Sequence, residues 1–329
     1  MEGRPALAKV DVLLPTPMSP KVMAALDAAF VVHRAWEAED KDRLIDTIGG
    51  SLRGVAIGLH ARIDRALMER LPKLEIVANF GVGYDSVDVK AAAERGVIVT
   101  NTPDVLTEEV ADTALGLLLM TAREFSAAER YLRAGRWAKE GPYRLTPATM
   151  RDRTVGIVGL GRIGMAIARR LEAMLVPVVY HNRSPRTDVP YRHYPDLKSM
   201  AADVDTLMIV LPGGAATKNL VDSEILKALG RNGILINIGR GSVVDEPALI
   251  EALGNGTILA AGLDVFAKEP QVPEALMALP NAVLLPHVAS ASVHTRDAMG
   301  QLVADNLISW FERGKPLTPV AETPWPRKA

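Results

Sequence analysis

The sequence predicts an α/β protein with two doubly wound parallel sheets, on three observations. Its 329 residues are more than one small core needs and suit two domains. Short apolar runs alternate with segments of helical periodicity, which is the pattern of parallel strands covered by helices on both faces. A glycine-rich turn, at Gly159, Gly161 and Gly164, follows one of these runs in the middle of the chain.

The N-terminal part of the chain carries a first set of strands and helices. Apolar runs predict strands, at 9–14, 54–59, 74–79 and 96–100. Helical spacing predicts helices between them, at 22–30, 64–71 and 87–95. A long, mostly apolar helix is predicted from Thr107 onward, and the next segment, 130–150, has no clear period and is interpreted as an extended arm.

The glycine turn is interpreted as a dinucleotide-binding turn. A predicted strand, 155–158, runs into it, and a predicted helix, 162–174, leaves it. The first glycine permits a tight turn, the second lets backbone amides approach a pyrophosphate, and the third lets the helix pack against the strand. Phosphate would bind the unpaired N–H groups at the start of that helix. The alternative is a tight turn that binds no nucleotide.

The position of this turn defines the predicted domains. Further strands are predicted after it, at 176–180, 206–211, 234–238, 258–265 and 282–285. An amphipathic helix, 295–313, comes next, and a proline-rich tail, 316–329, is expected to pack loosely. Because the turn lies in mid-chain, we expect a nucleotide domain over residues 104–287. It is inserted into a discontinuous substrate domain of residues 1–103 and 288–329, with the chemistry in the cleft between them.

Composition excludes several classes of protein. The net charge of −1 implies neither a nucleic-acid surface nor an acidic tail. The chain has no cysteine, which excludes disulfides and thiolate metal sites, and no metal site is expected. No apolar run is long enough to span a membrane, and the N-terminus has no signal-peptide core. We therefore expect a cytoplasmic protein.

Three polar side chains follow predicted strands of the nucleotide domain: Arg240, Glu269 and His287. In a doubly wound sheet, ligands bind beyond the carboxyl ends of the strands. Together the three form an acid/base set with an anion clamp. Taken singly, each has a structural alternative, as a surface cap, a loop start and a polar strand end. Their shared position favours the functional interpretation. His60 also follows a predicted strand and is noted with them.

The end of the strand 176–180 carries the prediction about the cofactor. Enzymes that use NAD usually place a carboxylate there to bind the ribose 2′-hydroxyl. Here the residues are Asn182, Arg183 and Ser184, which offer a guanidinium and a hydroxyl to a 2′-phosphate. We predict NADP(H), with NAD(H) as the weaker alternative. The structural alternative is a polar loop with incidental charge.

Seven sequence motifs resemble the D-2-hydroxyacid dehydrogenase family. In chain order they are N-F-G-V-G-Y-D at 79–85, E-E-V-A-D-T-A-L at 108–115, R-A-G-R-W at 133–137, V-G-L-G-R-I-G at 158–164, N-I-G-R-G at 237–241, G-L-D-V-F-A-K-E-P at 262–270 and L-P-H-V-A-S at 285–290. The segments H-N-R-S and P-H-V-A-S are most similar to the branch that reduces glyoxylate, hydroxypyruvate and hydroxyphenylpyruvate. The resemblance implies a Rossmann nucleotide domain inserted into a flavodoxin-like substrate domain.

The resemblance also implies roles for individual residues. Arg240 is implied to bind the substrate carboxylate and carbonyl, His287 to be the acid/base and Glu269 to pair with His287. This set makes physical sense, because a neighbouring carboxylate favours the protonated imidazole, which can donate to a carbonyl oxygen. The loop of Val82 and Gly83 is implied to bind the substrate carboxylate through its backbone amides.

The glycine turn and the resemblance together imply the cofactor contacts. They are Thr113, Leu160, Gly161, Arg162, Ile163, Asn182, Arg183, Ser184, Leu211, Pro212, Thr217, Ile238, Arg240, Asp264 and His287. The segment 211–217, L-P-G-G-A-A-T, departs from the common family form, which leaves its contacts less defined. Trp137 resembles an aromatic residue that reaches the partner subunit's site in a homodimer; the alternative is an anchor of the dimer interface alone.

The function predicted from these residues is NADPH-dependent reduction of small 2-keto acids, glyoxylate and hydroxypyruvate first, to D-2-hydroxy acids. Hydride transfer would be accompanied by proton donation from His287. Two alternatives stay open. One is a dinucleotide-sensing binding protein similar to the corepressors that share this fold. The other is a reductase of a different 2-keto acid, such as hydroxyphenylpyruvate or the keto acid of the phosphoglycerate couple.

Overall fold

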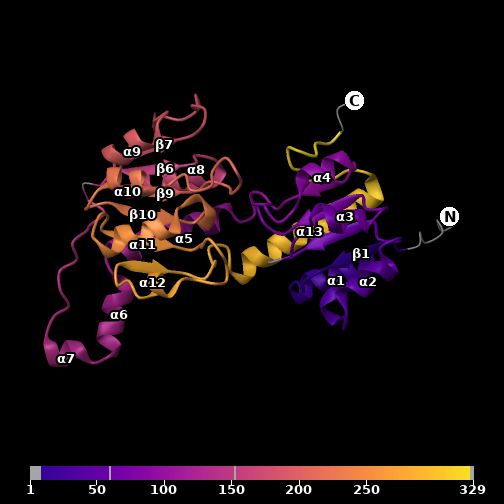
Figure 1. Cartoon of the computed structure of the whole chain (residues 1–329), viewed down its shortest axis with the longest axis horizontal. Helices are drawn as coiled ribbons and strands as arrows, with labels where there is room; N and C mark the ends of the chain where they lie inside the picture. Colours follow the sequence, from indigo (N-terminus) through magenta and orange to yellow (C-terminus); the bar gives the residue numbers. More distant parts are fainter. Residues whose placement is uncertain (1–8, 59–60, 152, 327–329) are drawn as a thin grey trace. The chain divides into compact units, whose positions relative to one another are not determined.

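Two parallel sheets, of five and seven strands, form the framework of the chain. The structure is a computed structural model that describes residues 9–58, 61–151 and 153–326 (Figure 1). The described residues divide into two compact units. Unit 1 is Met1–Leu106 with Ser292–Ala329, and unit 2 is Thr107–Ala291. The predicted fold class, two doubly wound parallel-sheet domains, is confirmed.

Unit 1 has the strand order β2-β1-β3-β4-β5, the doubly wound order of flavodoxin-like sheets. Its strands are β1 (Asp11–Leu14), β2 (Val31–Arg34), β3 (Gly54–Ile57), β4 (Ile76–Asn79) and β5 (Ile98–Thr100). Its helices are α1 (Pro20–Ala29), α2 (Lys41–Ile48), α3 (Arg65–Glu69), α4 (Val89–Glu94) and α13 (Val293–Arg313), with a short 3-10 helix at Ala35–Glu37.

The central strands of the unit 1 sheet are buried on both faces because they are almost entirely apolar. Every residue of β3 and β4 is buried. Successive side chains point to opposite faces, so one set packs in a core with α2, α3 and α4 and the other in a core with α1 and α13. Helix α13 comes from the C-terminal segment and packs against α1, β3 and β4.

The C-terminal tail corrects one expectation. Loose packing was expected of 316–329, but the amide of Val320 donates to Val99 O at 2.9 Å, and Val320 is 4% exposed. The hydroxyl of Thr323 accepts from the amide of Val99 at 2.9 Å. These contacts place the described part of the tail along β5, whose outer edge would otherwise lack hydrogen-bond partners.

Unit 2 has the strand order β12-β11-β10-β9-β6-β7-β8, which is the Rossmann order with one further strand. Its strands are β6 (Val155–Val158), β7 (Val178–His181), β8 (Arg192–His193), β9 (Thr206–Ile209), β10 (Ile234–Asn237), β11 (Ala260–Leu263) and β12 (Ala282–Leu284). Its helices are α5 (Thr107–Ala122), α6 (Phe125–Arg133), α7 (Arg136–Glu140), α8 (Arg162–Ala173), α9 (Leu197–Asp203), α10 (Ser223–Leu229), α11 (Glu246–Gly254) and α12 (Glu274–Met277), with a 3-10 helix at Gly241–Val243.

The segment 130–150 was predicted as an extended arm, and this is wrong in part, because the structure places the end of α6 and all of α7 in it. Figure 1 shows both helices projecting from the body of unit 2. Neither has a buried residue, so no apolar stripe facing a core marks them in the sequence. No helix of the described residues combines the length and apolar content needed to cross a membrane.

Candidate active site

The glycine turn joins β6 to α8 and leaves the start of α8 open. Gly159 has a φ of +104°, in the range that favours glycine. A Cβ at Gly164 would lie 2.4 Å from Gly159 O, so a side chain there would separate the helix from the strand. A Cβ at Gly161 would meet no atom within 4 Å, and Gly161 provides no side-chain cap to α8. The turn therefore leaves room at the N-terminus of α8, the place where a pyrophosphate binds in dinucleotide-binding folds.

Two side chains hold the peptide groups of Leu160 at the centre of this turn. The Leu160 amide donates to Asn182 Oδ1 at 2.7 Å, and Arg186 Nη1 donates to Leu160 O at 3.0 Å. Since Asn182 Oδ1 is used in this way, the polar group that Asn182 offers to a ligand is the donor Nδ2. A donor suits the oxygens of a 2′-phosphate, where a carboxylate would repel them.

Arg183 and Ser184, which directly follow Asn182, are exposed. The carboxylate of this loop, Asp188, is paired with Arg186 Nη2 at 2.5 Å. Hydrogen bonds from Arg186 hold the pKa of Asp188 below its ordinary value. The loop therefore combines two guanidinium groups, an exposed hydroxyl and a carboxylate that is already paired.

Arg240 sits in a turn after β10 that the neighbouring backbone confines on both sides. A Cβ at Gly239 would lie 2.6 Å from Leu211 O, and a Cβ at Gly241 would lie 1.9 Å from the carbonyl carbon of Phe266. The buried side chain of Asn237 closes the turn: it donates to Arg240 O and accepts from the Gly239 amide, both at 3.0 Å. The guanidinium of Arg240 donates through Nη1 to Gly239 O at 2.8 Å.

Glu269 and His287 form a close pair at the carboxyl edge of the same sheet. His287 Nδ1 lies 2.6 Å from Glu269 Oε2, and Glu269 Oε1 accepts from the Phe266 amide at 3.0 Å. A carboxylate at Nδ1 requires a proton on that nitrogen, which leaves Nε2 to exchange protons with a ligand. In the described part of the chain, Nε2 has no partner. The His287 side chain is 39% exposed, so a ligand can reach it.

The charge state of Glu269 reflects this pairing. Burial alone raises the pKa of Glu269, but hydrogen bonds from His287 and the Phe266 amide and the positive charges of His287 and Arg240 outweigh burial. The net result is a pKa below the ordinary value of 4.5. Glu269 is therefore an anion at neutral pH. Arg240, in the turn after β10 of the same sheet, contributes to this lowering through its positive charge.

Asp264 organises the loop that carries His287. The backbone of His287 is in the left-handed region, with a φ of +55°, and its amide donates to Asp264 O at 2.9 Å. The amides of Val288 and Ala289 donate to Asp264 Oδ1 and Oδ2 at 2.7 and 2.9 Å. Burial raises the pKa of Asp264 despite these hydrogen bonds. Thr113 of α5 completes the loop by donating to Ala289 O at 3.1 Å.

The other predicted residues fall into two groups. Leu211, Pro212 and Thr217 share a loop after β9, closed by Thr217 Oγ1 donating to Pro212 O at 2.8 Å, and Ile238 follows β10. These four belong to the same sheet edge of unit 2. Three lie elsewhere: Trp137 is on α7, while Val82 and Gly83 are in unit 1, in the loop after β4. His60 lies outside the described residues.

Sequence reasoning missed two residues of this edge, Asn237 and Arg186. Asn237 is the last residue of a buried strand and gives no signal beyond its polarity. Arg186 contacts the backbone of a residue 26 positions away, which residue type alone does not indicate. The described residues contain no group of three or more acidic or histidine side chains that could hold a metal ion.

A Rossmann unit with an open glycine turn, a histidine–carboxylate pair and a nearby arginine at the carboxyl edge of one sheet defines the class: a dinucleotide-dependent dehydrogenase. The model of the D-isomer-specific 2-hydroxyacid dehydrogenase family, for its NAD-binding domain, matches residues 115–289. The chain belongs to this family.

Similar proteins agree with this assignment. A glyoxylate/hydroxypyruvate reductase of Arabidopsis thaliana is 45% identical over 314 residues, 95% of this chain and 100% of the relative. A hydroxyphenylpyruvate reductase of Plectranthus scutellarioides is 45% identical over 94% of this chain and 99% of its own length. The crystal structure of an NADPH-dependent glyoxylate/hydroxypyruvate reductase of Sinorhizobium meliloti, with NADP and malonate, has a TM-score of 0.91 and 53% identity, covering 98% of this chain and 100% of that one.

Proposed function

We propose that this protein reduces small 2-keto acids, glyoxylate and hydroxypyruvate first, to D-2-hydroxy acids with NADPH. The observation that carries the proposal is the hydrogen bond of 2.6 Å between His287 and Glu269, with Arg240 in the turn after β10 of the same sheet. The retained catalytic set argues against the alternative of a dinucleotide-sensing binding protein. The names of the relatives support the same activity.

In the proposed reaction, each of the three side chains has one task. Arg240 binds the substrate carboxylate and carbonyl oxygen with its planar fork of donors. His287 gives the proton on Nε2 to the carbonyl oxygen, and Glu269 orients the imidazole and stabilises its protonated form. The nicotinamide, when bound, supplies the hydride that the carbonyl carbon accepts. In the reverse direction, Nε2 accepts the proton of the alcohol.

The choice of NADPH rests on the loop after β7. Its ligand-facing groups are the donors of Asn182, Arg183 and Ser184, and its carboxylate, Asp188, is engaged by Arg186. We expect NADPH oxidation with glyoxylate and hydroxypyruvate, and an Arg183→Ala variant with a KM for NADPH raised roughly 10- to 100-fold and little change for NADH. Initial rates with both cofactors on a panel that includes hydroxyphenylpyruvate measure this.

Arg192→Ala is the matched control for the cofactor loop, because this arginine lies on the neighbouring strand β8 and stacks on Tyr194 at 4.3 Å. This variant should leave the KM for NADPH and the KM for NADH unchanged. Equal or better use of NADH by the unmodified protein would contradict the cofactor assignment. Absence of turnover on the whole panel, with intact NADPH binding, would favour a dinucleotide-sensing binding protein.

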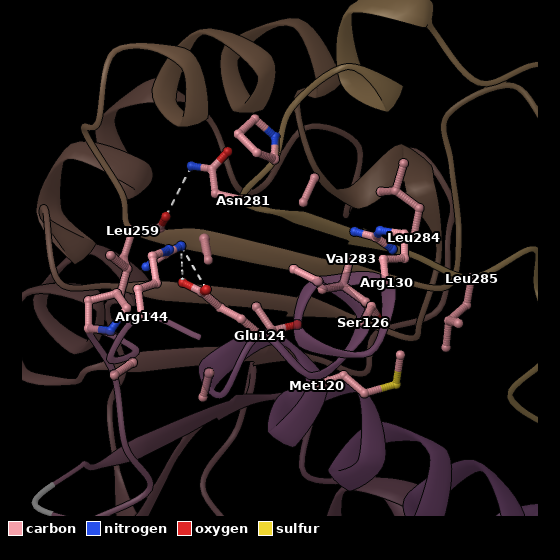
Figure 2. Close-up of a pocket in the computed structure, with 18 residues that line it drawn as sticks. Met120, Glu124, Ser126, Arg130, Arg144, Leu259, Asn281, Val283, Leu284 and Leu285 are labelled. Carbon is pink, nitrogen blue, oxygen red and sulfur yellow. Dashed lines mark hydrogen bonds and ion pairs between the residues drawn. The ribbon is translucent and has the colours of Figure 1, made fainter. Parts of the chain in front are cut away.

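The projecting helices support a homodimer. Large apolar side chains are exposed along one segment of unit 2: Phe125 is 48% exposed, Leu132 54%, Trp137 61% and Leu145 94%. Beside them, α5, α6 and β12 line a pocket of about 240 Å³ (Figure 2). None of the predicted site residues lines this pocket. A concentration of exposed apolar side chains next to a hollow is typical of a protein interface, and we propose a second copy of the chain as the occupant.

Light scattering should give a mass of twice 35.4 kDa for the unmodified protein. Phe125→Glu with Leu132→Glu should shift it to the mass of a single chain, because both charges would be buried in the interface. Leu175→Glu is the control, because Leu175 is an apolar residue of unit 2 that is 89% exposed and lies outside the segment 125–145. A single-chain mass for the unmodified protein would contradict the proposal.

The role of Trp137 is tested in a Trp137→Ala variant that remains a dimer. A raised KM for the keto acid would assign Trp137 to the substrate site, whereas an unchanged KM would assign it to the interface alone.

A further inference from the structure

The loop after β4 in unit 1 has all three of its central carbonyl groups bound by asparagine side chains. Asn79 Nδ2 donates to Gly81 O at 3.2 Å and to Gly83 O at 3.0 Å. Asn101 Nδ2, from the end of β5, donates to Val82 O at 2.9 Å. Each asparagine amide replaces the neighbouring strand that these carbonyls would bind in a sheet.

The orientation of the carbonyls determines where the amides of the loop point. In a planar trans peptide, the C=O of one residue and the N–H of the next point in opposite directions. The carbonyls of Gly81 and Val82 are turned toward Asn79 and Asn101. The N–H groups of Val82 and Gly83 are therefore turned away from them, and in the described part of the chain neither N–H has an acceptor.

The loop is also fixed at its base. The Gly81 amide donates to Thr102 Oγ1 at 3.0 Å, and the Thr102 amide donates to Gly81 O at 2.9 Å. Gly81 has a φ of +147°, in the range that favours glycine. Asn79 is 4% exposed, and its Oδ1 accepts from Ser86 Oγ at 3.4 Å. Both Oδ1 and Nδ2 of the buried Asn79 side chain thus have hydrogen-bond partners, which keeps Nδ2 directed at the loop.

We infer that Asn79 and Asn101 are positioning residues for substrate binding: they hold the amides of Val82 and Gly83 as a preformed pair of donors for a carboxylate. The inference rests on the proposed function, to which it adds the residues that shape the anion site. Two adjacent N–H groups without internal partners suit the two oxygens of a carboxylate. Because the asparagines act through the loop, they do not touch the substrate.

Asparagine is required at both positions because the acceptors are carbonyl oxygens. Asn79→Asp and Asn101→Asp keep the shape of the side chain but remove the donors and add a negative charge beneath the loop. We expect the KM for the 2-keto acid and the Kd for malonate each to rise roughly 10- to 100-fold in either variant. The KM for NADPH should stay within about two-fold, since the cofactor residues belong to unit 2.

Malonate binding, measured by calorimetry in the presence of NADP, separates this inference from the proposed reaction because malonate undergoes no turnover. The matched control is Asn281→Asp: Asn281 Nδ2 also donates to two carbonyls, Leu253 O at 3.2 Å and Leu259 O at 3.0 Å, but in unit 2. This variant should lower the melting temperature and leave the Kd for malonate unchanged.

The outcomes are distinct. If the protein binds malonate and both unit 1 variants lose that binding, the inference holds even where no keto acid is reduced. If either folded variant binds malonate as the unmodified protein does, or if the unmodified protein binds none, the inference is overturned. Should Asn79→Asp fail to fold, the Kd of Asn101→Asp for malonate decides, because Asn101 is less buried than Asn79.

Discussion

Replacement of His287 by alanine is expected to lower kcat for keto-acid reduction by about 10²- to 10⁴-fold, the usual contribution of a positioned general acid. Because His287 Nδ1 is bound to Glu269 at 2.6 Å, the proton donor is Nε2, and alanine provides no substitute. Binding of NADPH should be largely retained, since the glycine turn and the loop after β7 do not involve His287. Stopped-flow turnover and NADPH fluorescence titration measure the two effects.

His33 provides a matched control, because its Nε2 lies 2.6 Å from Asp11 Oδ1 in unit 1, so it has the same pair chemistry at the same distance. His33→Ala should keep full activity. Full activity of His287→Ala would remove His287 from its proposed role.

Glu269→Gln tests the pairing itself through the pH dependence of the reaction. The pKa of Glu269 lies below 4.5, so the stabilising charge of this carboxylate is present above that pH and is lost as the pH falls through the lowered value. At neutral pH, glutamine removes a charge that favours the protonated imidazole. The kcat for reduction should therefore fall at neutral pH, and the fall in kcat that accompanies protonation of Glu269 in acid should be absent from the variant; an unchanged profile would contradict the pairing role.

Arg240→Lys is expected to lower kcat/KM by roughly 10²- to 10³-fold, with an increase in the KM for the keto acid. Lysine keeps the positive charge but loses the planar fork that can bind a carboxylate and a carbonyl oxygen together. Leu211 O and the backbone of Phe266 lie close to the two glycines that flank Arg240. The backbone therefore cannot move to bring the shorter lysine side chain to both substrate groups. Steady-state kinetics with glyoxylate and NADPH separate the effects on kcat and KM.

Arg231→Lys is the control for Arg240, because Arg231 is an exposed arginine in the turn before β10. It should leave both constants unchanged. If Arg240→Lys retained the kcat/KM of the unmodified protein, bidentate binding by Arg240 would be excluded.

The central strands could be predicted from the sequence because they are buried on both faces. In β6, β9, β10 and β11 every residue is buried, so each appears as a continuous apolar run. The edge strands β2 and β8 were not predicted. They carry polar residues, such as His33 and Arg192, and are only partly buried. Helix α2 was missed for a related reason, since Ile45 is its one buried residue.

The candidate site was predictable where a general rule about strand ends applied. That rule selected Arg240, Glu269 and His287, although the last two are 18 residues apart in sequence and their hydrogen bond depends on how two loops fold. Asn79 and Asn101 also stand at strand ends, but the rule does not show which backbone carbonyls their side chains bind. Such contacts depend on loop geometry, which residue type alone does not determine.

The discontinuity of unit 1 has a consequence for biosynthesis. Helix α13 buries Val303, Ala304 and Leu307 against the sheet face formed by Val12, Ala56 and Ile76. The ribosome releases β1 to β5 long before α13, whereas unit 2 is one continuous segment and can fold as soon as it has emerged. The nucleotide unit is thus completed first, and during that interval the nascent chain exposes the apolar face that α13 later covers.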